Sequence, residues 1–234
     1  MQHRSKKIKK SFFIILVVLI VLSGGSAIYL GNYYHSVDVE KYMNGSSEVS
    51  VEKFDKGWFF DGAGEEKALI FYPGAKVATE AYAPLMYQLT ESGIDCFLVD
   101  MPFHMAFFGM NRAEEIMQEY NYEAWYLGGH SLGGAMAANF AADYVEDHTD
   151  GIRGLLLLAA YPTKDLSTSD MSVVTVYGSE DGVLNMDKIV AGRELMPQDY
   201  KEVCIEGGNH AQFGSYGTQK GDGTAAIPAE EQWA

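Results

Sequence analysis

The sequence predicts an α/β fold, in which a mostly parallel sheet carries helices on both faces and one apolar segment precedes the domain. Apolar runs of Val, Ile, Leu and Phe alternate with stretches of helical periodicity along most of the 234 residues. This alternation is typical of a sheet that is buried on both faces. Polar and glycine-rich sequence follows several of the apolar runs, and a charge-free run of about 20 residues, long enough to cross a bilayer, comes first.

The N-terminal segment has the character of an export signal. Its first ten residues, MQHRSKKIKK, carry five basic side chains and no acidic one, and the run that follows has no charge up to Leu30. Since a basic flank stays on the cytoplasmic side, we expect residues 1–11 to be cytoplasmic, 12–30 to be a transmembrane anchor and the domain to be extracytoplasmic. The alternative is a cleaved signal peptide, with Phe12–Leu22 as its apolar region and Gly25–Ala27 as its cleavage site. Both interpretations export the domain.

Charge and composition limit the possible partners. The chain has 17 basic and 32 acidic residues, a net charge of −15, and without the five basic residues of the leader the balance is 12 against 32. A surface this acidic repels phosphate backbones, so we expect no nucleic-acid partner. The apolar fraction of 47% is enough for a folded core.

The two cysteines, Cys96 and Cys204, lie within the apolar runs DCFLVDM and KEVCIEG. A disulfide is possible in an exported protein, but runs of this kind favour buried free thiols. No Cys/His pair has the spacing of zinc ligands, so we expect neither a metal site nor a cofactor.

The elements of the domain follow in order after a polar spacer at residues 31–47. VSVEKF and GWFFDG alternate in polarity and meet at Asp55-Lys56-Gly57, which predicts a hairpin. The remaining strands are predicted at 68–74, 95–102, 124–127, 154–162, 171–182 and 200–210, and the helices at 79–93, 112–120, 135–144 and 186–196. In parallel sheets of this kind, ligands bind beyond the carboxyl ends of the strands.

One strand end carries a G-x-S-x-G sequence, Gly129-His130-Ser131-Leu132-Gly133. It lies between the apolar run AWYL and an alanine-rich helix, which is the setting of a nucleophile elbow. Glycine flanks the serine because the turn leaves no room for side chains, and the helix N-terminus favours developing negative charge. A simple glycine-rich strand turn would have the same composition, so the serine needs partners elsewhere.

Three side chains at neighbouring strand ends provide those partners. Ser131, Asp181 and His210 follow three of the predicted strands in the order Ser, Asp, His, the chain order of a triad on this type of sheet. His210 is the predicted base and Asp181, next to Gly182, the predicted acid. Glu180 is the adjacent alternative acid and Asp165 the fallback.

The other histidines are weaker candidates for the base. His104 also follows a strand end but precedes the serine, and we expect the side chain of His130, inside the elbow, to point away from Ser131. An oxyanion intermediate needs two N–H donors. We expect them from the backbone of Leu132, directly after the serine, and of Ala75, in the turn opened by Gly74.

Four motifs in order, FYPGAKV, GGHSLGGAMAANFAADY, YGSEDG and EGGNHAQFG, resemble the α/β-hydrolase family, and most of all its small exported or membrane-anchored members of the dienelactone-hydrolase-like type. The resemblance covers about residues 48 to 225. It implies a hydrolase domain at 48–234, with an eight-stranded, mostly parallel sheet and Ser131, Asp181 and His210 as the triad. Only TKDLSTSD separates two predicted strands where many members carry a lid, so no lid domain is expected. The usual C-terminal helix is barely begun, at IPAEEQWA.

The predicted function is that of a serine hydrolase, an esterase or lipase-like enzyme that cleaves carboxylic esters through an acyl-enzyme. Its substrate would be a small or lipid-like acyl ester. A serine peptidase or an acyltransferase would use the same triad, and a non-catalytic binding module on this fold is the remaining alternative.

Two loops of the predicted domain each allow two interpretations. MPFHMAFFGM, residues 101–110, could form a substrate wall through Phe103, His104 and Phe107, or its apolar side chains could merely pack the loop down. GDGTAA, residues 221–226, superficially resembles a calcium loop, but with one carboxylate it is better interpreted as an ordinary loop.

Overall fold

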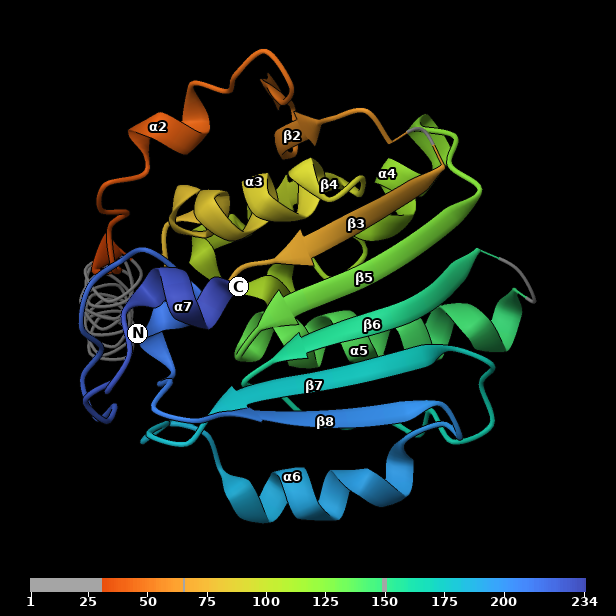
Figure 1. Ribbon diagram of the computed structural model, residues 1–234. Coiled ribbons are helices and arrows are strands. Elements are labelled where there is room, and N and C mark those ends of the chain that lie inside the picture. The colour runs from red at the N-terminus through yellow and green to blue at the C-terminus, as the bar shows by residue number, and fades with distance from the viewer. Residues whose placement is uncertain (1–30, 65, 149–150) are drawn as a thin grey trace, which may run out of the picture. The chain divides into compact units, whose positions relative to one another are not determined.

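An eight-stranded sheet organises the part of the chain that this computed structural model describes, residues 31–64, 66–148 and 151–234. In chain order the strands are β1 (Ser50–Phe54), β2 (Gly57–Asp61), β3 (Lys67–Tyr72), β4 (Asp95–Val99), β5 (Ala124–His130), β6 (Ile152–Leu158), β7 (Ser172–Gly178) and β8 (Tyr200–Ile205). In space they follow the order β1-β2-β4-β3-β5-β6-β7-β8 (Figure 1). The strands from β4 to β8 in this order are parallel, whereas β1 and β2 form the expected antiparallel hairpin at one edge. The mostly parallel eight-stranded sheet is therefore confirmed.

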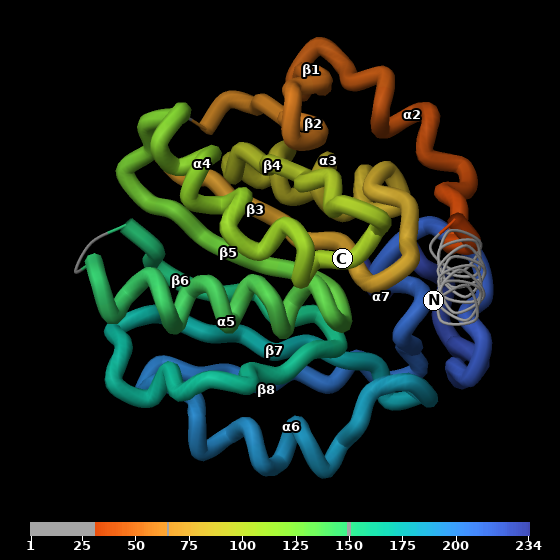
Figure 2. Tube along the Cα trace, turned by 180° about the vertical axis from the view of Figure 1, so that it is seen from behind, coloured from red at the N-terminus to blue at the C-terminus, as the bar shows by residue number. Residues whose placement is uncertain are grey.

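The helices divide between the two faces of the sheet. They are α2 (Glu40–Met43), α3 (Ala83–Glu91), α4 (Arg112–Glu119), α5 (Leu132–Asp147), α6 (Met186–Gly192) and α7 (Ala229–Trp233). Alternate residues of β3 enter two separate core clusters: Ile70 lies in the cluster with α4 and α5, and Phe71 in the cluster with α3. Figures 1 and 2 show α3 and α5 on opposite faces of the sheet.

Small side chains bring α5 close to the sheet. Ala137, Ala138, Ala141 and Ala142 are all buried, and the helix runs three residues beyond the predicted end at residue 144 and begins three residues before the predicted start. Burial of a continuous alanine face explains why this segment is helical over more than four turns. The first turn of α5 is thus placed directly at the end of β5.

Several predicted elements are shorter than expected because the chain leaves the sheet early. β4 ends at Val99 and β6 at Leu158, and the segment expected as one helix at 79–93 is a 3₁₀ turn at Thr79–Tyr82 followed by α3. The connection between β6 and β7, residues 159–171, contains no helix. Nothing in this connection covers the carboxyl end of the sheet as a helical lid would.

The structure tests the N-terminal predictions only in part. The expected cytoplasmic segment, 1–11, and the expected anchor, 12–30, lie outside the described residues. Among the residues that are described, no helix combines the length and the apolar character that a membrane crossing needs.

The expected spacer is part of the folded domain from Tyr34 onward. Residues 34–234 form one compact unit, to which the described residues 31–33 do not belong. The Tyr34 N–H donates to the Lys76 carbonyl, and the Ala78 N–H donates back to the Tyr34 carbonyl, at 2.7 and 2.8 Å. Val39 and Val49 are buried in the same cluster as α3. The folded unit therefore begins before residue 48.

The cysteine predictions are half right. Cys96 is a buried free thiol on β4, but Cys204 is exposed, so its predicted burial is wrong. β8 is an edge strand on which Lys201, Val203 and Cys204 are exposed, a property that its sequence does not reveal. Four strands separate β4 from β8. At about 4.8 Å per strand the two thiols are far beyond the ~7 Å that a disulfide allows.

Candidate active site

Ser131 lies at the junction of β5 and α5 in a strained backbone conformation. Its φ of 54° and ψ of −122° are rare for a residue with a side chain. Its N–H donates to the Leu158 carbonyl at 2.9 Å, which attaches the turn to β6. The Leu132 N–H, the first of α5, has no acceptor among the described residues. The geometry is that of a nucleophile elbow.

Close backbone packing explains the glycines of the elbow. A Cβ at Gly133 would lie 2.1 Å from the Tyr72 carbonyl oxygen, and one at Gly129 would lie 2.6 Å from the Gly133 carbonyl carbon. A Cβ at Gly134 would lie 2.5 Å from the Cβ of Ala160. The turn therefore excludes side chains at all three positions, and the strain at Ser131 is held by contacts that cannot relax.

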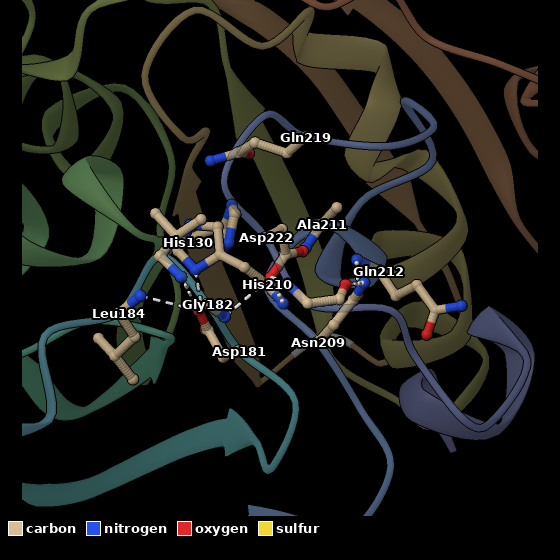
Figure 3. Close-up of polar contacts among 12 residues, drawn as sticks. His130, Asp181, Gly182, Leu184, Asn209, His210, Ala211, Gln212, Gln219 and Asp222 are labelled. Carbon is tan, nitrogen blue, oxygen red and sulfur yellow. Dashed lines mark hydrogen bonds and ion pairs between the residues drawn. The ribbon is translucent and has the colours of Figure 1, made fainter.

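The side chains of His210 and Asp181 form a buried hydrogen-bonded pair (Figure 3). His210 Nδ1 lies 2.8 Å from Asp181 Oδ2, and each side chain is 2% exposed. The other carboxylate oxygen, Oδ1, accepts the N–H groups of Val183 and Leu184 at 2.9 and 2.8 Å. Asp181 is thus the carboxylate that contacts the imidazole, while the adjacent Glu180 is exposed.

One cavity joins the serine and the histidine. Ser131, Leu132 and His210 line a cavity of about 330 Å³, with walls from the first turns of α5, the segment after β6 and the turn after Asp181. His210 Nε2 is buried and has no partner among the described residues. Among the described residues, no Asp, Glu, Lys or Arg lines this cavity. The arrangement offers an unoccupied ring nitrogen and a hydroxyl to an uncharged ligand.

The turn after β3 contains the other predicted oxyanion donor, Ala75, which does not line the cavity of Ser131. The Gly74 N–H donates to the Tyr82 hydroxyl at 3.0 Å, and the Lys76 N–H donates to the His104 carbonyl at 2.7 Å. Between them, the Ala75 N–H has no acceptor among the described residues. β3 pairs directly with β5, with Tyr72 opposite Gly129, so this turn lies beside the elbow.

His130 connects that turn to the predicted base. The Tyr82 hydroxyl lies 2.7 Å from His130 Nδ1, and the His130 ring lies 4.4 Å from the His210 ring between centroids. The Tyr82 oxygen also accepts the Gly74 N–H, while His130 Nε2 is buried without a partner among the described residues. Burial, together with the neighbouring His210, holds the pKa of His130 well below its ordinary value. His130 is therefore a neutral ring, and the sequence had suggested no role for it.

The C-terminal helix supports the His210 loop although it is short. α7 buries Gln232, whose Oε1 accepts the Asn209 N–H at 2.9 Å and whose Nε2 donates to the Asn209 carbonyl at 2.8 Å. The Trp233 indole donates to the Gln212 carbonyl. These contacts fix the backbone directly before His210. No local sequence motif predicts them.

The predicted substrate residues Phe103, His104 and Phe107 lie on the loop after β4, and none of them lines the cavity of Ser131. The rings of Phe103 and Phe107 are 59% and 48% exposed, and both contact Phe108. Burial lowers the pKa of His104. Their role in binding substrate stays a prediction.

Comparison with solved structures supports the fold. A carboxyl esterase 2 from the fungus Tuber melanosporum is 13% identical, with a TM-score of 0.58 over 77% of this chain and 82% of that one. A putative hydrolase from Agrobacterium vitis S4 is 13% identical, with a TM-score of 0.56 over 70% and 93%. A carboxylesterase from Bacillus subtilis is 9% identical, with a TM-score of 0.52 over 74% and 89%. Likeness at such identity shows the fold alone.

No curated protein sequence matches the chain significantly. The model of the alpha/beta hydrolase family matches residues 68–234, which include every residue of the site described above. The sheet order, the elbow and this match agree, and the chain belongs to the α/β-hydrolase family.

Proposed function

We propose that the protein is a serine hydrolase that cleaves carboxylic esters, with Ser131 as nucleophile, His210 as base and Asp181 as acid. One observation carries the proposal: His210 is held by a buried Asp181 and keeps its Nε2 without a partner, in the same cavity as a serine on a strained elbow. The esterase names of several structural neighbours support the ester class. The finer likeness to dienelactone hydrolases stays a prediction.

The reaction follows from these groups. His210 Nε2 accepts the Ser131 proton while the oxygen attacks the ester carbonyl, and the resulting oxyanion accepts hydrogen bonds from the Leu132 and Ala75 N–H groups. The alcohol leaves with the proton from His210, and water then hydrolyses the acyl-enzyme by the same route. The Asp181 carboxylate accepts the hydrogen bond from His210 Nδ1–H and stabilises the imidazolium. A neutral His130 beside the ring does not oppose its positive charge.

The cavity favours small, uncharged substrates. Its volume of about 330 Å³ is at the lower end for ligand sites. The described residues of its walls include Met136, Tyr161 and Leu184 but no Asp, Glu, Lys or Arg. We therefore propose short acyl esters of neutral alcohols as the substrate class. A peptidase or acyltransferase reaction on the same triad is the alternative.

Two assays test the proposal. A fluorophosphonate probe is expected to label the wild type but not Ser131→Ala. A series of p-nitrophenyl esters of increasing acyl length is expected to be cleaved best at short length, with no cleavage of peptides. Peptide cleavage in preference to esters would replace the esterase by a peptidase, and an unlabelled wild type would leave only a binding module.

We also propose that residues 12–30 anchor the protein in the cytoplasmic membrane, with the domain outside. The basis is the basic leader and the charge-free run. Protease added to intact cells is then expected to degrade the domain, and the full-length chain to fractionate with membranes. A mature chain that begins near Ile28 and is found in the medium would mean a cleaved signal peptide, and a protected domain would refute export.

A further inference from the structure

Asp222 connects three separate segments through its carboxylate (Figure 3). Its Oδ1 accepts the N–H groups of Gly182, His210 and Gly223 at 3.1, 3.2 and 2.8 Å, and its Oδ2 accepts the Ala211 N–H at 2.8 Å. Gly182 directly follows the acid Asp181, and Ala211 directly follows the base. A single side chain from a third loop therefore bonds the backbone on both sides of the acid–base contact.

We propose that Asp222 is a positioning residue for the reaction, which holds the Asp181 turn and the His210 loop at the separation that their hydrogen bond requires. This inference rests on the proposed function of Asp181 and His210. Asp222 does not line the cavity of Ser131, so it acts through these two residues and does not touch the substrate.

The sheet cannot set this separation by itself. The hydrogen-bonded ladder between β7 and β8 ends at the pair Gly178–Ile205, and both members of the acid–base pair lie beyond it. Two backbone bonds continue the connection: the Ser179 N–H donates to the Ile205 carbonyl at 2.9 Å, and the Glu180 N–H donates to the Gly208 carbonyl at 2.8 Å. Asp222 supplies the contacts at Gly182 and His210, where no ladder remains.

Close packing fixes the Asp222 turn against the acid turn. A Cβ at Gly182 would lie 2.6 Å from the Gly221 carbonyl oxygen, and one at Gly223 would lie 1.9 Å from the Glu180 carbonyl oxygen. The Asn209 side chain donates to the Gly223 carbonyl at 2.9 Å, which ties the same turn to the histidine loop. The backbone of residues 221–223 thus lies in contact with both segments.

The chemistry requires a carboxylate at this position. Four N–H donors converge on it, and only an ionised carboxylate offers acceptor sites on both oxygens. An asparagine at 222 would turn an NH₂ donor toward at least one N–H donor. Charge-assisted bonds of this kind are also stronger than those to a neutral amide oxygen.

The test compares Asp222→Asn and Asp222→Ala with the wild type on a short p-nitrophenyl ester. We expect kcat to fall about 10- to 100-fold, with alanine worse than asparagine, because small displacements of catalytic groups have effects of this size. KM is expected to stay within about twofold, since the cavity wall is unchanged. The low-field proton resonance of the His210–Asp181 hydrogen bond, assigned by its loss in His210→Gln, is expected to shift or disappear in both variants.

Asp95→Asn is the matched control. Asp95 is also buried and its carboxylate also accepts a backbone N–H, that of Gly62 at 2.9 Å, together with the Tyr122 hydroxyl at 2.7 Å, but it lies at the opposite end of β4 from the site. We expect this variant to lose stability while it keeps kcat and the low-field resonance.

The outcomes separate the two proposals. A wild-type kcat and an unchanged resonance in Asp222→Asn would overturn the positioning role, even if Ser131→Ala is inactive. A loss of kcat no larger than that of Asp95→Asn would overturn it as well. If Asp222→Ala fails to fold, the asparagine variant and its resonance still decide. An active Ser131→Ala would refute the proposed function instead, and the resonance would still test the Asp222 contacts.

Discussion

Residues at positive φ recur after several strands at the carboxyl end of the sheet, and two of these stretches, the elbow and the loop after β4, differ in what surrounds them. At the elbow, Ser131 has a φ of 54° and lies among backbone atoms that leave no room for a Cβ at its neighbours. On the loop after β4, Phe103 and His104 have φ of 57° and 54°, but the Phe103 ring is 59% exposed. Backbone strain can be held rigidly only where packed backbone surrounds it.

A buried tyrosine supports each of these stretches. The Tyr82 hydroxyl accepts the Gly74 N–H and contacts His130, whereas the Tyr72 hydroxyl accepts the Ala113 N–H and donates to the Met110 carbonyl. Burial raises the pKa of both tyrosines, so both stay protonated. Both residues are buried, protonated tyrosines, but only the Tyr82 hydroxyl contacts residues of the candidate site.

The largest expected effect is at the elbow itself. Ser131→Ala removes the proposed nucleophile without adding bulk, so kcat for esters is expected to fall by at least about 10⁴-fold while the fold is kept. Steady-state kinetics and circular dichroism measure both. Ser92→Ala, at the end of α3, is the control and is expected to keep full activity; near-normal turnover of Ser131→Ala would end the nucleophile assignment.

A methyl group at a glycine tests the rigidity of the two stretches. In Gly133→Ala the new Cβ meets backbone at 2.1 Å, and we expect a loss of about 3 kcal/mol or more, a Tm drop on the order of 10 °C, and inactivity. In Gly109→Ala the nearest atoms are the Met101 sulfur at 2.9 Å and a Pro102 side-chain carbon at 3.0 Å, which can shift. Its loss is expected to stay within about 1 kcal/mol. Equal melting temperatures would contradict the comparison.

The tyrosines separate stability from catalysis. Tyr82→Phe and Tyr72→Phe each leave a buried backbone N–H without its acceptor, so both are expected to lose about 1–3 kcal/mol, measured by urea unfolding. Only Tyr82→Phe loosens the turn of Ala75, and its kcat is expected to fall about tenfold. A similar loss of kcat in Tyr72→Phe would mean that the loop after β4 also serves the reaction.

An ion pair outside both stretches gives a reference for stability alone. Hydrogen bonds from Arg193, then from Tyr177 and Tyr200, lower the pKa of Glu202 to about 2. Because the folded pKa lies below the unfolded value of about 4.5, its stabilisation is present above that pH and is lost as the pH falls toward 2. Glu202→Gln is expected to lower Tm by about 2–4 °C at pH 7, a discounted figure because Arg193 is half exposed.

Melting curves between pH 2 and 7 test this expectation. The difference between wild type and Glu202→Gln should shrink below about pH 4, and ester turnover at pH 7 should be equal. A difference that does not depend on pH would assign the effect to packing instead of charge.

The smallest effect is expected on the exposed loop. Replacing Phe103 and Phe107 by serine is expected to change kcat/KM for short esters by less than about twofold, because neither ring lines the cavity. The length series of esters checks this. A loss confined to long acyl chains would support the substrate wall that the sequence suggested for these residues.

The sequence predicted the strands, the helices and the elbow because their causes are local. Periodicity distinguishes buried strands from helices, and the steric demand of the turn at Ser131 appears directly as flanking glycines. The prediction that Ser131, Asp181 and His210 lie at one rim followed from the rule that ligands bind beyond the carboxyl ends of parallel strands, and their chain order matched that of a triad on this type of sheet. The strands, the helices and the elbow depend on neighbours within a few residues.

The remaining features depend on contacts between segments that are distant in the sequence, so they follow only from the tertiary structure. Cys204 is exposed because β8 lies at the edge of the sheet, and Asp222 and Gln232 reach the His210 loop because the C-terminal segment folds back over it. No periodicity or motif marks such residues, because the hydrogen-bond partners of a carboxylate or an amide depend on which distant segments the fold brings next to it. The types of side chain proposed for the site are therefore recognisable from short stretches of the sequence. The contacts that align Asp181 with His210 arise only when β7, β8 and the C-terminal turn pack together.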